Sequence, residues 1–365
     1  MRRSASKLLR RKGFTMLELL VAVSLSVVVV AGLYGVFQIQ SRQLMYQDTQ
    51  MYMHQNLRFA ADILSRSTRM AGYGTGGATR GPMGYDYSAD SSDDDYSLPA
   101  LVAYDGGTSG TDAITVVYAD PSLEMTSAVA TIEACSATSI TFDMSMRNYS
   151  SLIENYSSGE LLMCWDYDSV GRVRSYVWEI TADGDSATGA IDITSNSGTY
   201  SDFDSSCGTT ENLPPIMNCS RGVVVSFYID NDESDNVGPG SDEHPVLMMD
   251  LNFTYPSQGA VDDDVPLVDD IEDMQIEYCP ADDDCSEESN WEDGLSLDGN
   301  GNYEGETAWM VRFSLVARTP REDVRTDHFS EKRPGVANHS ASSTADGYHR
   351  QLLNTQVTIR NLRLL

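Results

Sequence analysis

The first seventy residues carry an apolar pattern of helical period. Residues 19–41 contain no charged side chain over 23 positions, and about 20 helical residues are enough to cross the hydrocarbon core of a bilayer. Beyond this run, apolar residues recur three and four positions apart, with arginine and aspartate on the opposite side. The residues of this apolar face are Met53, Leu57, Ala60, Ala61 and Leu64. We therefore predict one helix over residues 15–70, ended by the glycines that begin at Gly72.

Alternation of apolar and polar residues predicts β-strands in the rest of the chain. The predicted strands span residues 112–119, 137–144, 175–181, 222–230, 245–255, 272–279, 308–319 and 351–364. Residues 72–98 are rich in glycine, serine and aspartate and are predicted to form a loop. The pattern predicts the α+β class, with a long amino-terminal helix (residues 14–71) packed on an antiparallel β-sheet domain (residues 99–365) that has long loops.

The charges around the apolar run predict its place in a membrane. The run is preceded by six basic residues, Arg2, Arg3, Lys7, Arg10, Arg11 and Lys12, and such residues stay on the cytoplasmic side. A cleavable secretory signal has an apolar stretch of roughly 7–15 residues, so this run is too long for one, and no Ala-x-Ala pattern follows it. We expect residues 14 to about 40 to span the inner membrane and the remainder of the chain to be exported to the periplasm.

Glu18 lies near the start of this membrane-length segment, which contains no other charge until Arg42. A charge at that depth costs a few kcal/mol and usually has a partner, although a glutamate at a helix end can also snorkel to the interface. The surrounding letters KGFTMLELLVA, residues 12–22, closely resemble the type III signal of type IV pilins and of the pseudopilins of type II secretion. Met16 and Leu17 stand where that family more often has leucine and isoleucine, which keeps the apolar character.

This resemblance implies that residues 1–13 are a leader peptide. In the family a prepilin peptidase cuts after the glycine and methylates the new amino terminus, which places the cut between Gly13 and Phe14 and the methyl group on Phe14. Glu18 then becomes the fifth residue of the mature chain, where it can pair with the ammonium of Phe14 on a neighbouring subunit. Two costly isolated charges become one compensated pair. We interpret Glu18 as an assembly mark that fixes the axial register between subunits.

Later blocks of sequence are similar to PilW-type minor pilins and occur in the same order. These blocks are QNLRFAADILSRSTRMAGYG (residues 55–74), TDAITVVYA (111–119), PLVDDIEDMQIEY (266–278) and LLNTQVTIRNL (352–362). The resemblance implies a type IV pilin-like fold and a minor pilin of a type IV pilus. It also implies the partners: other minor pilins and the major pilin, the prepilin peptidase, and the inner-membrane assembly machinery. After assembly the chain would lie in the pilus fibre at the cell surface.

The charge of the exported part argues against nucleic-acid binding, which needs a basic surface. The chain has a formal net charge of −31, which loss of the basic leader makes more negative still. Residues 222–311 contain no lysine or arginine. Basic residues return from Arg312 onward, and either they face the acidic middle of the chain within one fold or they meet an acidic partner subunit. The sequence leaves both alternatives open.

The six cysteines all lie in the exported part, where an even count indicates disulfides. They are Cys135, Cys164, Cys207, Cys219, Cys279 and Cys285. Of the 15 possible pairings we favour those between neighbours, Cys279–Cys285 and Cys207–Cys219, because each closes a short loop. A zinc site is the competing interpretation, but no Cys-x-x-Cys is present.

Two acidic stretches carry oxygen-bearing side chains at alternate positions, as a loop that wraps Ca²⁺ does. The stronger candidate set is Asp298, Asn300, Asn302, Glu304 and Glu306; the weaker is Asp230, Asp232, Ser234 and Asn236. The stronger set lacks the glycine at loop position six and the glutamate at position twelve that an EF-hand has. A solvated acidic hairpin is the alternative, so Ca²⁺ remains a candidate and no other cofactor is expected.

Catalytic motifs are missing from the sequence. It contains no His-Glu-x-x-His, no Gly-x-Ser-x-Gly and no glycine-rich nucleotide loop after a strand. The five histidines are isolated from one another and are expected at the surface. We therefore expect a structural protein and not an enzyme.

Two other functions fit the sequence. A J-type minor pseudopilin of a type II secretion system shares the signal and the glutamate, but such proteins are typically shorter than this chain. A tip adhesin with Ca²⁺-binding acidic loops is the second alternative. The favoured hypothesis is a minor pilin that contributes to initiation and assembly of the pilus fibre within a minor-pilin complex.

Overall fold

The computed structural model describes residues 14–74, 78–80, 97–123, 132–136, 138–142, 152–167, 173–193, 218–231, 244–251, 265–280, 284–293, 308–321 and 331–359. The chain divides into two compact units, Met1–Tyr52 and Met53–Leu365. The first helix runs through both, and each unit is described by itself.

Helix α1 spans Met16–Met70, which confirms the predicted helix to within one residue at its start. The glycines after it end the helix as expected, because Gly72 and Gly74 both have φ of 77°, a conformation that glycine adopts without steric cost. A Cβ atom on Gly74 would lie 2.7 Å from the Cβ of Ala119. The chain passes this close because the N–H of Gly72 donates to Val117 O and the N–H of Ala119 donates to Tyr73 O.

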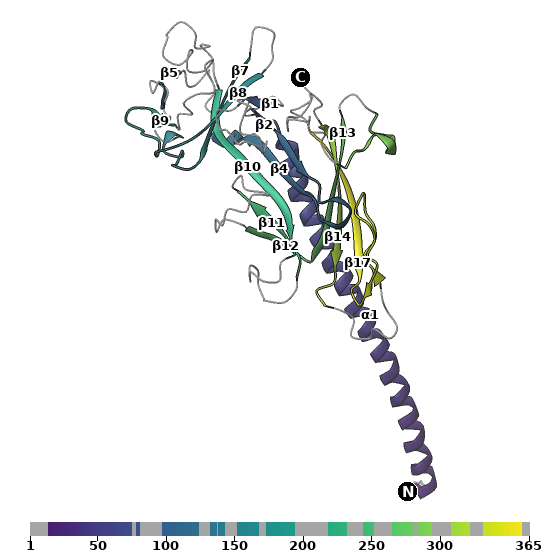
Figure 1. Cartoon of the computed structure of the whole chain (residues 1–365). Helices are drawn as coiled ribbons and strands as arrows, with labels where there is room; N and C mark the ends of the chain where they lie inside the picture. The colour runs from purple at the N-terminus through teal and green to yellow at the C-terminus, as the bar shows by residue number, and fades with distance from the viewer. Residues whose placement is uncertain are drawn as a thin grey trace, which may run out of the picture. The chain divides into compact units, whose positions relative to one another are not determined.

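Two antiparallel sheets make up most of the second unit (Figure 1). The larger sheet has the order β12-β11-β10-β4-β3, and β7 pairs with both β10 and β8. Its strands are β3 (Leu101–Tyr104), β4 (Ala113–Ala119), β7 (Leu161–Tyr167), β8 (Val173–Glu179), β10 (Asn218–Asp230), β11 (Val246–Asp250) and β12 (Val265–Asp269). The smaller sheet has the order β13-β14-β17, with β13 (Ile271–Pro280), β14 (Ala308–Arg318) and β17 (Arg350–Thr358).

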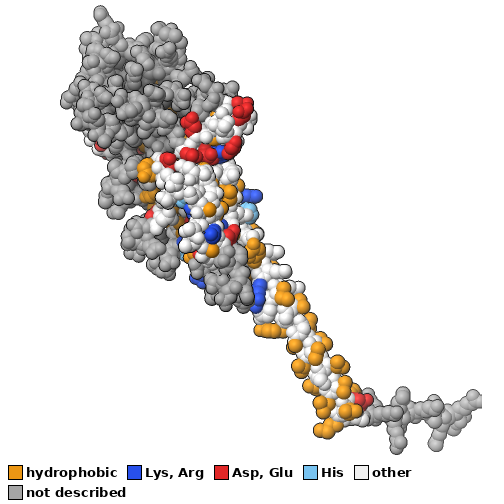
Figure 2. Space-filling view, turned by 45° about the vertical axis from the view of Figure 1, so that its right-hand side comes forward, with side chains coloured by type: hydrophobic (Ala, Val, Ile, Leu, Met, Phe, Trp, Pro, Cys, Tyr) orange, Lys and Arg blue, Asp and Glu red, His pale blue; other side chains and the backbone are white. Residues whose placement is uncertain are grey.

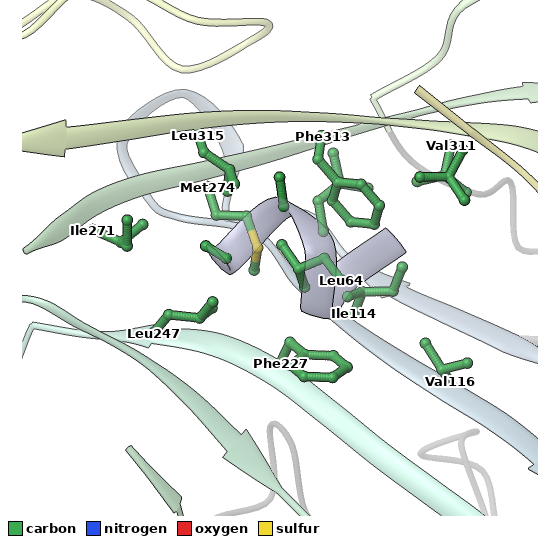
Figure 3. Close-up of a cluster of buried hydrophobic side chains, with 14 of the residues drawn as sticks. Leu64, Ile114, Val116, Phe227, Leu247, Ile271, Met274, Val311, Phe313 and Leu315 are labelled. Atoms are coloured by element: carbon green, nitrogen blue, oxygen red, sulfur yellow. The ribbon is translucent and has the colours of Figure 1, made fainter. Parts of the chain in front are cut away.

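The main hydrophobic core joins both sheets to the second half of α1. The side chains labelled in Figure 3 come from α1 (Leu64), β4 (Ile114, Val116), β10 (Phe227), β11 (Leu247), β13 (Ile271, Met274) and β14 (Val311, Phe313, Leu315). On β14, alternate residues enter this core, as strand geometry requires for a half-buried sheet. The predicted helix face is confirmed, since Met53, Leu57, Ala60, Ala61 and Leu64 are all buried.

A smaller lobe leaves the large sheet after β4 and returns at β10. Ala119 at the end of β4 and Gly222 on β10 are cross-strand partners, so the two ends of this long connection lie side by side. The lobe contains the three-stranded sheet β5-β6-β9, and it is joined to the larger sheet by the hairpin of β7 and β8, which pairs with the first residues of β10. The bounds are β5 (Ile132–Ser136), β6 (Ser139–Phe142) and β9 (Ala190–Asp192). A separate hydrophobic cluster, which includes Phe142, Tyr156 and Trp178, forms its interior.

Each predicted strand region contains an observed strand, which confirms the β-rich prediction. Strands missing from the prediction are β3, β5, β7, β9 and β12, together with the short pairs β15 (Glu331–Lys332) with β16 (Ala345–Asp346) and β1 (Ala78–Arg80) with β2 (Ser97–Pro99). The last pair corrects the loop predicted over residues 72–98. Strands of two or three residues are too short to show an alternating pattern, so sequence alone does not reveal them.

Three of the basic residues from Arg312 onward pair with acidic residues within the same fold. Arg312 pairs with Glu277 at 2.6 Å, Arg333 with Asp273 at 2.6 Å, and Arg350 with Glu272 at 2.6 Å. All three carboxylates belong to β13. For these residues the structure favours the first of the two alternatives that the sequence left open.

Replacement of Leu64 by alanine tests the central position of α1. Leu64 has no exposed surface, so the cavity that Leu64→Ala leaves should lower the free energy of unfolding by about 2–5 kcal/mol. Phe59→Ala is the control, because Phe59 on the same helix is 55% exposed. Chemical denaturation of the full chain in detergent, followed by tryptophan fluorescence, measures both. Equal effects of the two substitutions would contradict the packing described here.

Candidate functional site: the start of the amino-terminal helix

Thr15 and Glu18 form a reciprocal cap at the start of α1. The backbone N–H and the hydroxyl of Thr15 each donate to Glu18 Oε2 at 2.9 Å, and the N–H of Glu18 donates to Thr15 Oγ1 at 3.3 Å. This is a capping box, in which two side chains satisfy N–H groups that the first helical turn leaves without partners. The carboxylate also lies where the helix dipole favours negative charge.

The capping role of Glu18 is the feature that sequence reasoning missed. A threonine followed three residues later by glutamate, directly before an apolar run, is the recognised sequence signature of this cap. The structure therefore assigns Glu18 a contact within its own chain. The predicted pairing with a neighbouring subunit is a separate contact, and it stays a prediction.

The first half of α1 presents apolar side chains on every side. α1 is the one helix among the described residues that is long and apolar enough to cross a membrane, and none of its most apolar stretch is buried. Figure 2 shows the orange hydrophobic side chains along this helix. Phe14, just before the helix, is 80% exposed. An apolar surface of this extent needs a partner that is not water, either lipid or other protein surfaces.

Gly13 and the rest of the leader, residues 1–13, lie outside the described residues. The prediction that the chain is cut between Gly13 and Phe14 and methylated on Phe14 therefore stays a prediction on structural grounds.

Two disulfides lie among the described residues. Cys279 and Cys285 form one of them, which confirms that predicted pair. Cys219 is bonded to Cys164, so the predicted Cys207–Cys219 pair is wrong. The reason is strand register: Cys164 on β7 is the direct cross-strand partner of Cys219 on β10, and this proximity in the sheet outweighs proximity in the sequence. Cys135 lies in β5, and Cys207 lies outside the described residues.

The candidate Ca²⁺ ligands are not placed by the structure. Asp298, Asn300, Asn302, Glu304 and Glu306 lie outside the described residues, as do Asp232, Ser234 and Asn236 of the weaker set. Within the described part of the chain, no group of three or more histidine, cysteine, aspartate or glutamate side chains is arranged to hold a metal ion. Ca²⁺ binding stays untested.

The histidines depart from the expected surface positions in one case. His339 is 8% exposed, and its Nδ1 lies 2.9 Å from Asp273 Oδ2. His244 is partly exposed beside Asp270, and His54 on α1 contacts Gln351. His349 also lies among the described residues, and His328 does not.

Two family models match the chain. Residues 8–34 match the model described as the prokaryotic N-terminal methylation motif. This range of the chain contains Gly13, Phe14 and Glu18. Residues 226–361 match the model described as type IV pilus-assembly protein W, a range that runs from the middle of β10 to the end of β17. The chain is therefore similar to PilW-type minor pilins over residues 226–361 and carries the methylation motif of such proteins near its amino terminus.

The comparison with solved structures includes one type IV-like pilin, TTHA1219 from Thermus thermophilus. It is 9% identical, with a TM-score of 0.33, and the match covers 85% of this chain and 97% of that chain. The search of curated proteins gave no match. The methylation motif and the apolar helix together indicate a membrane-anchored pilin.

Removal of each disulfide in turn tests the corrected pairing. The Cys164–Cys219 bond spans a sequence separation of 55 and the Cys279–Cys285 bond a separation of 6. The chain-entropy model gives a loss of about 4 kcal/mol for the first and about 2 kcal/mol for the second. Each pair is replaced by serines together, and the unfolding free energies are compared. Peptide mapping under non-reducing conditions would contradict the assignment if it linked Cys219 to Cys207.

Proposed function

We propose that this chain is a minor pilin that helps to initiate type IV pilus assembly as part of a minor-pilin complex in the inner membrane. The observation that carries the proposal is the apolar first half of α1, which is exposed on all sides. The start of this helix falls within residues 8–34, which match the N-terminal methylation motif. The match to the type IV pilus-assembly family over residues 226–361 supports the same function.

The helix suits two successive environments. Before assembly its apolar surface is covered by lipid, and afterwards by the helices of neighbouring subunits. Both environments are apolar, so the transfer from one to the other exposes no apolar surface to water and leaves all helical backbone hydrogen bonds intact. A single helix can therefore serve as membrane anchor and as assembly interface.

Glu18 would fix the register of that assembly. Processing between Gly13 and Phe14 creates an α-ammonium group, which would pair with Glu18 of a neighbouring subunit. Both Thr15 donors bind Oε2 of Glu18, so within the described residues Oε1 has no hydrogen-bond partner and can accept from that ammonium group. One carboxylate can thus cap its own helix and mark the position of the next subunit.

The second unit would select the partners. Other minor pilins would recognise its sheet domain through side-to-side contacts. The proposed partners are other minor pilins, the major pilin, the prepilin peptidase and the inner-membrane assembly machinery. The alternative functions are a J-type pseudopilin and a Ca²⁺-dependent tip adhesin. A negative result in the first experiment below would support one of these two.

A deletion strain tests the assembly role. Surface fibres are counted by electron microscopy after an in-frame deletion, with pilus retraction also disabled so that slow initiation is not hidden by retraction. We expect loss of fibres and recovery with a plasmid copy of the gene. Unchanged fibre numbers with weaker attachment would support an adhesin, and loss of secretion with normal fibres would support a pseudopilin.

Substitution of Glu18 tests the register mechanism separately. Glu18→Ala should leave processing intact and strongly reduce incorporation into fibres, because the α-ammonium of Phe14 loses its partner. Thr15→Val is the matched control: it removes the cap hydroxyl at a cost of about 1 kcal/mol but keeps the carboxylate. Gly13→Arg marks the position of the unprocessed chain on an immunoblot. If Thr15→Val lowered incorporation as much as Glu18→Ala, the cap and not the register would explain the effect.

A further inference from the structure

A buried polar network fastens the end of the β3–β4 connection to the middle of β13. Asp112, the residue before β4, is 2% exposed. Its N–H donates to Met274 O at 2.9 Å, and its Oδ2 accepts the N–H of Ile276 at 2.7 Å. Its Oδ1 accepts the N–H of Gly106 at 3.0 Å. The bonds to Met274 and Ile276 connect the larger sheet to the smaller one, and the bond from Gly106 fixes the Asp112 carboxylate within its own connection.

A second buried carboxylate lies in the same network. Asp273 on β13 has no exposed surface, and its carboxylate accepts from Arg333 at 2.6 Å and lies 2.9 Å from His339. Gln275 Nε2 donates to Asp273 Oδ1 at 2.9 Å and to Gly110 O at 3.0 Å. Arg333 and His339 come from the segment that follows β15, so three parts of the chain meet here.

The charges of this network do not balance. The charged and titratable groups around Asp112 are Asp105 on its own connection, Asp273 on β13, and Arg333 and His339, which both contact Asp273. Asp112 itself accepts only from backbone N–H groups. Gln275 Oε1 is buried and has no hydrogen-bond partner among the described residues. The network therefore holds more carboxylates than its cations neutralise and more hydrogen-bond acceptors than donors. Both features favour the binding of one further proton.

We propose that Asp112, with Asp273, Arg333 and His339, forms a proton-binding clip that holds the two sheets together more firmly as the pH falls. Uptake of a proton removes a buried charge that has no cation bound to it, while the backbone bonds between the β3–β4 connection and β13 can remain. The exported unit would thereby gain rigidity in acidic surroundings. This device is independent of the proposed function, since it concerns the fold of the second unit.

The direction of the pH effect follows from the affinity of Asp112 for its proton. Burial raises the pKa of Asp112 from 3.8 to about 7; the two N–H bonds oppose this increase, and the charges of Asp105 and Asp273 add to it. Between pH 3.8 and about 7 the folded chain holds a proton that the unfolded chain has released. Stability from this group is therefore fully present at the lower end of this range and is lost as the pH rises through about 7.

The test compares the pH dependence of unfolding in variants of the full chain in detergent. Loss of self-repulsion in an acidic protein also stabilises it at lower pH, so the decisive quantity is a difference between variants. Asp112→Asn removes the proposed proton site, and Asp192→Asn removes an exposed carboxylate on β9. Per unit of pH fall between 7 and 5, we expect the wild-type folding constant to gain up to about tenfold more than that of Asp112→Asn. Asp192→Asn should behave like the wild type, and equal pH dependence in all three chains would overturn the proposal.

A second variant keeps the test decisive if Asp112→Asn does not fold. Asp105 is exposed, and its negative charge raises the proton affinity of Asp112. Asp105→Asn removes this charge, while the amide oxygen of the asparagine can still accept the hydrogen bonds from Gly107 and Asn338. We expect the pH at which stability changes most steeply to move downward relative to Asp192→Asn. An unchanged midpoint would contradict the clip.

Discussion

The second unit depends on the burial of one face of α1 between its two sheets. Leu57 and Leu64, two turns apart, lie in the core, and Ala60 between them lets the strands approach the helix closely. Neither sheet could cover its apolar face alone, since each is open on the side that meets the helix. The helix thus completes one hydrophobic core that it shares with both sheets. The larger and smaller sheets then need few direct links, and the bonds between Asp112 and β13 are among those that they have.

The lobe between β4 and β10 does not depend on α1 for its hydrophobic core. Its two ends lie side by side at the paired residues Ala119 and Gly222, and its main apolar cluster is separate from the one around α1. The Cys164–Cys219 bond ties it to the sheet at that point. The matched PilW range begins at residue 226, beyond the lobe. The matched range therefore covers the smaller sheet and the last part of β10, whereas the lobe lies outside it.

The sequence predicted the elements whose residues repeat a local period. α1 was found to within a residue because its apolar face recurs over many turns, and β10 and β14 were found because they are long and bury alternate residues. The short strands of the lobe show no such repeat. The Cys164–Cys219 bond depends on the register between β7 and β10, which no local pattern encodes. Among site residues, Glu18 was identified by its setting in an apolar run, whereas its bond to Thr15 would have required attention to the Thr-x-x-Glu spacing. Asp112 looked like one aspartate among many, because burial is a property of the folded chain.

The acidic middle of the sequence finds part of its explanation in β13. The negative charge that looked like a solvated surface or a cation site includes Glu272 and Glu277, and arginines from β14 and β17 converge on these carboxylates. Arg312 donates through Nε and Nη2 to the two oxygens of Glu277 at 2.7 and 2.6 Å, and Arg350 binds Glu272 in the same way at 2.6 and 2.9 Å. Lysine cannot reproduce this planar, two-pronged contact. Partial burial removes competing water, so such pairs select one arrangement of strands more than they add net stability. Specific charge pairs thus align the strands of the smaller sheet, and its apolar face packs on α1.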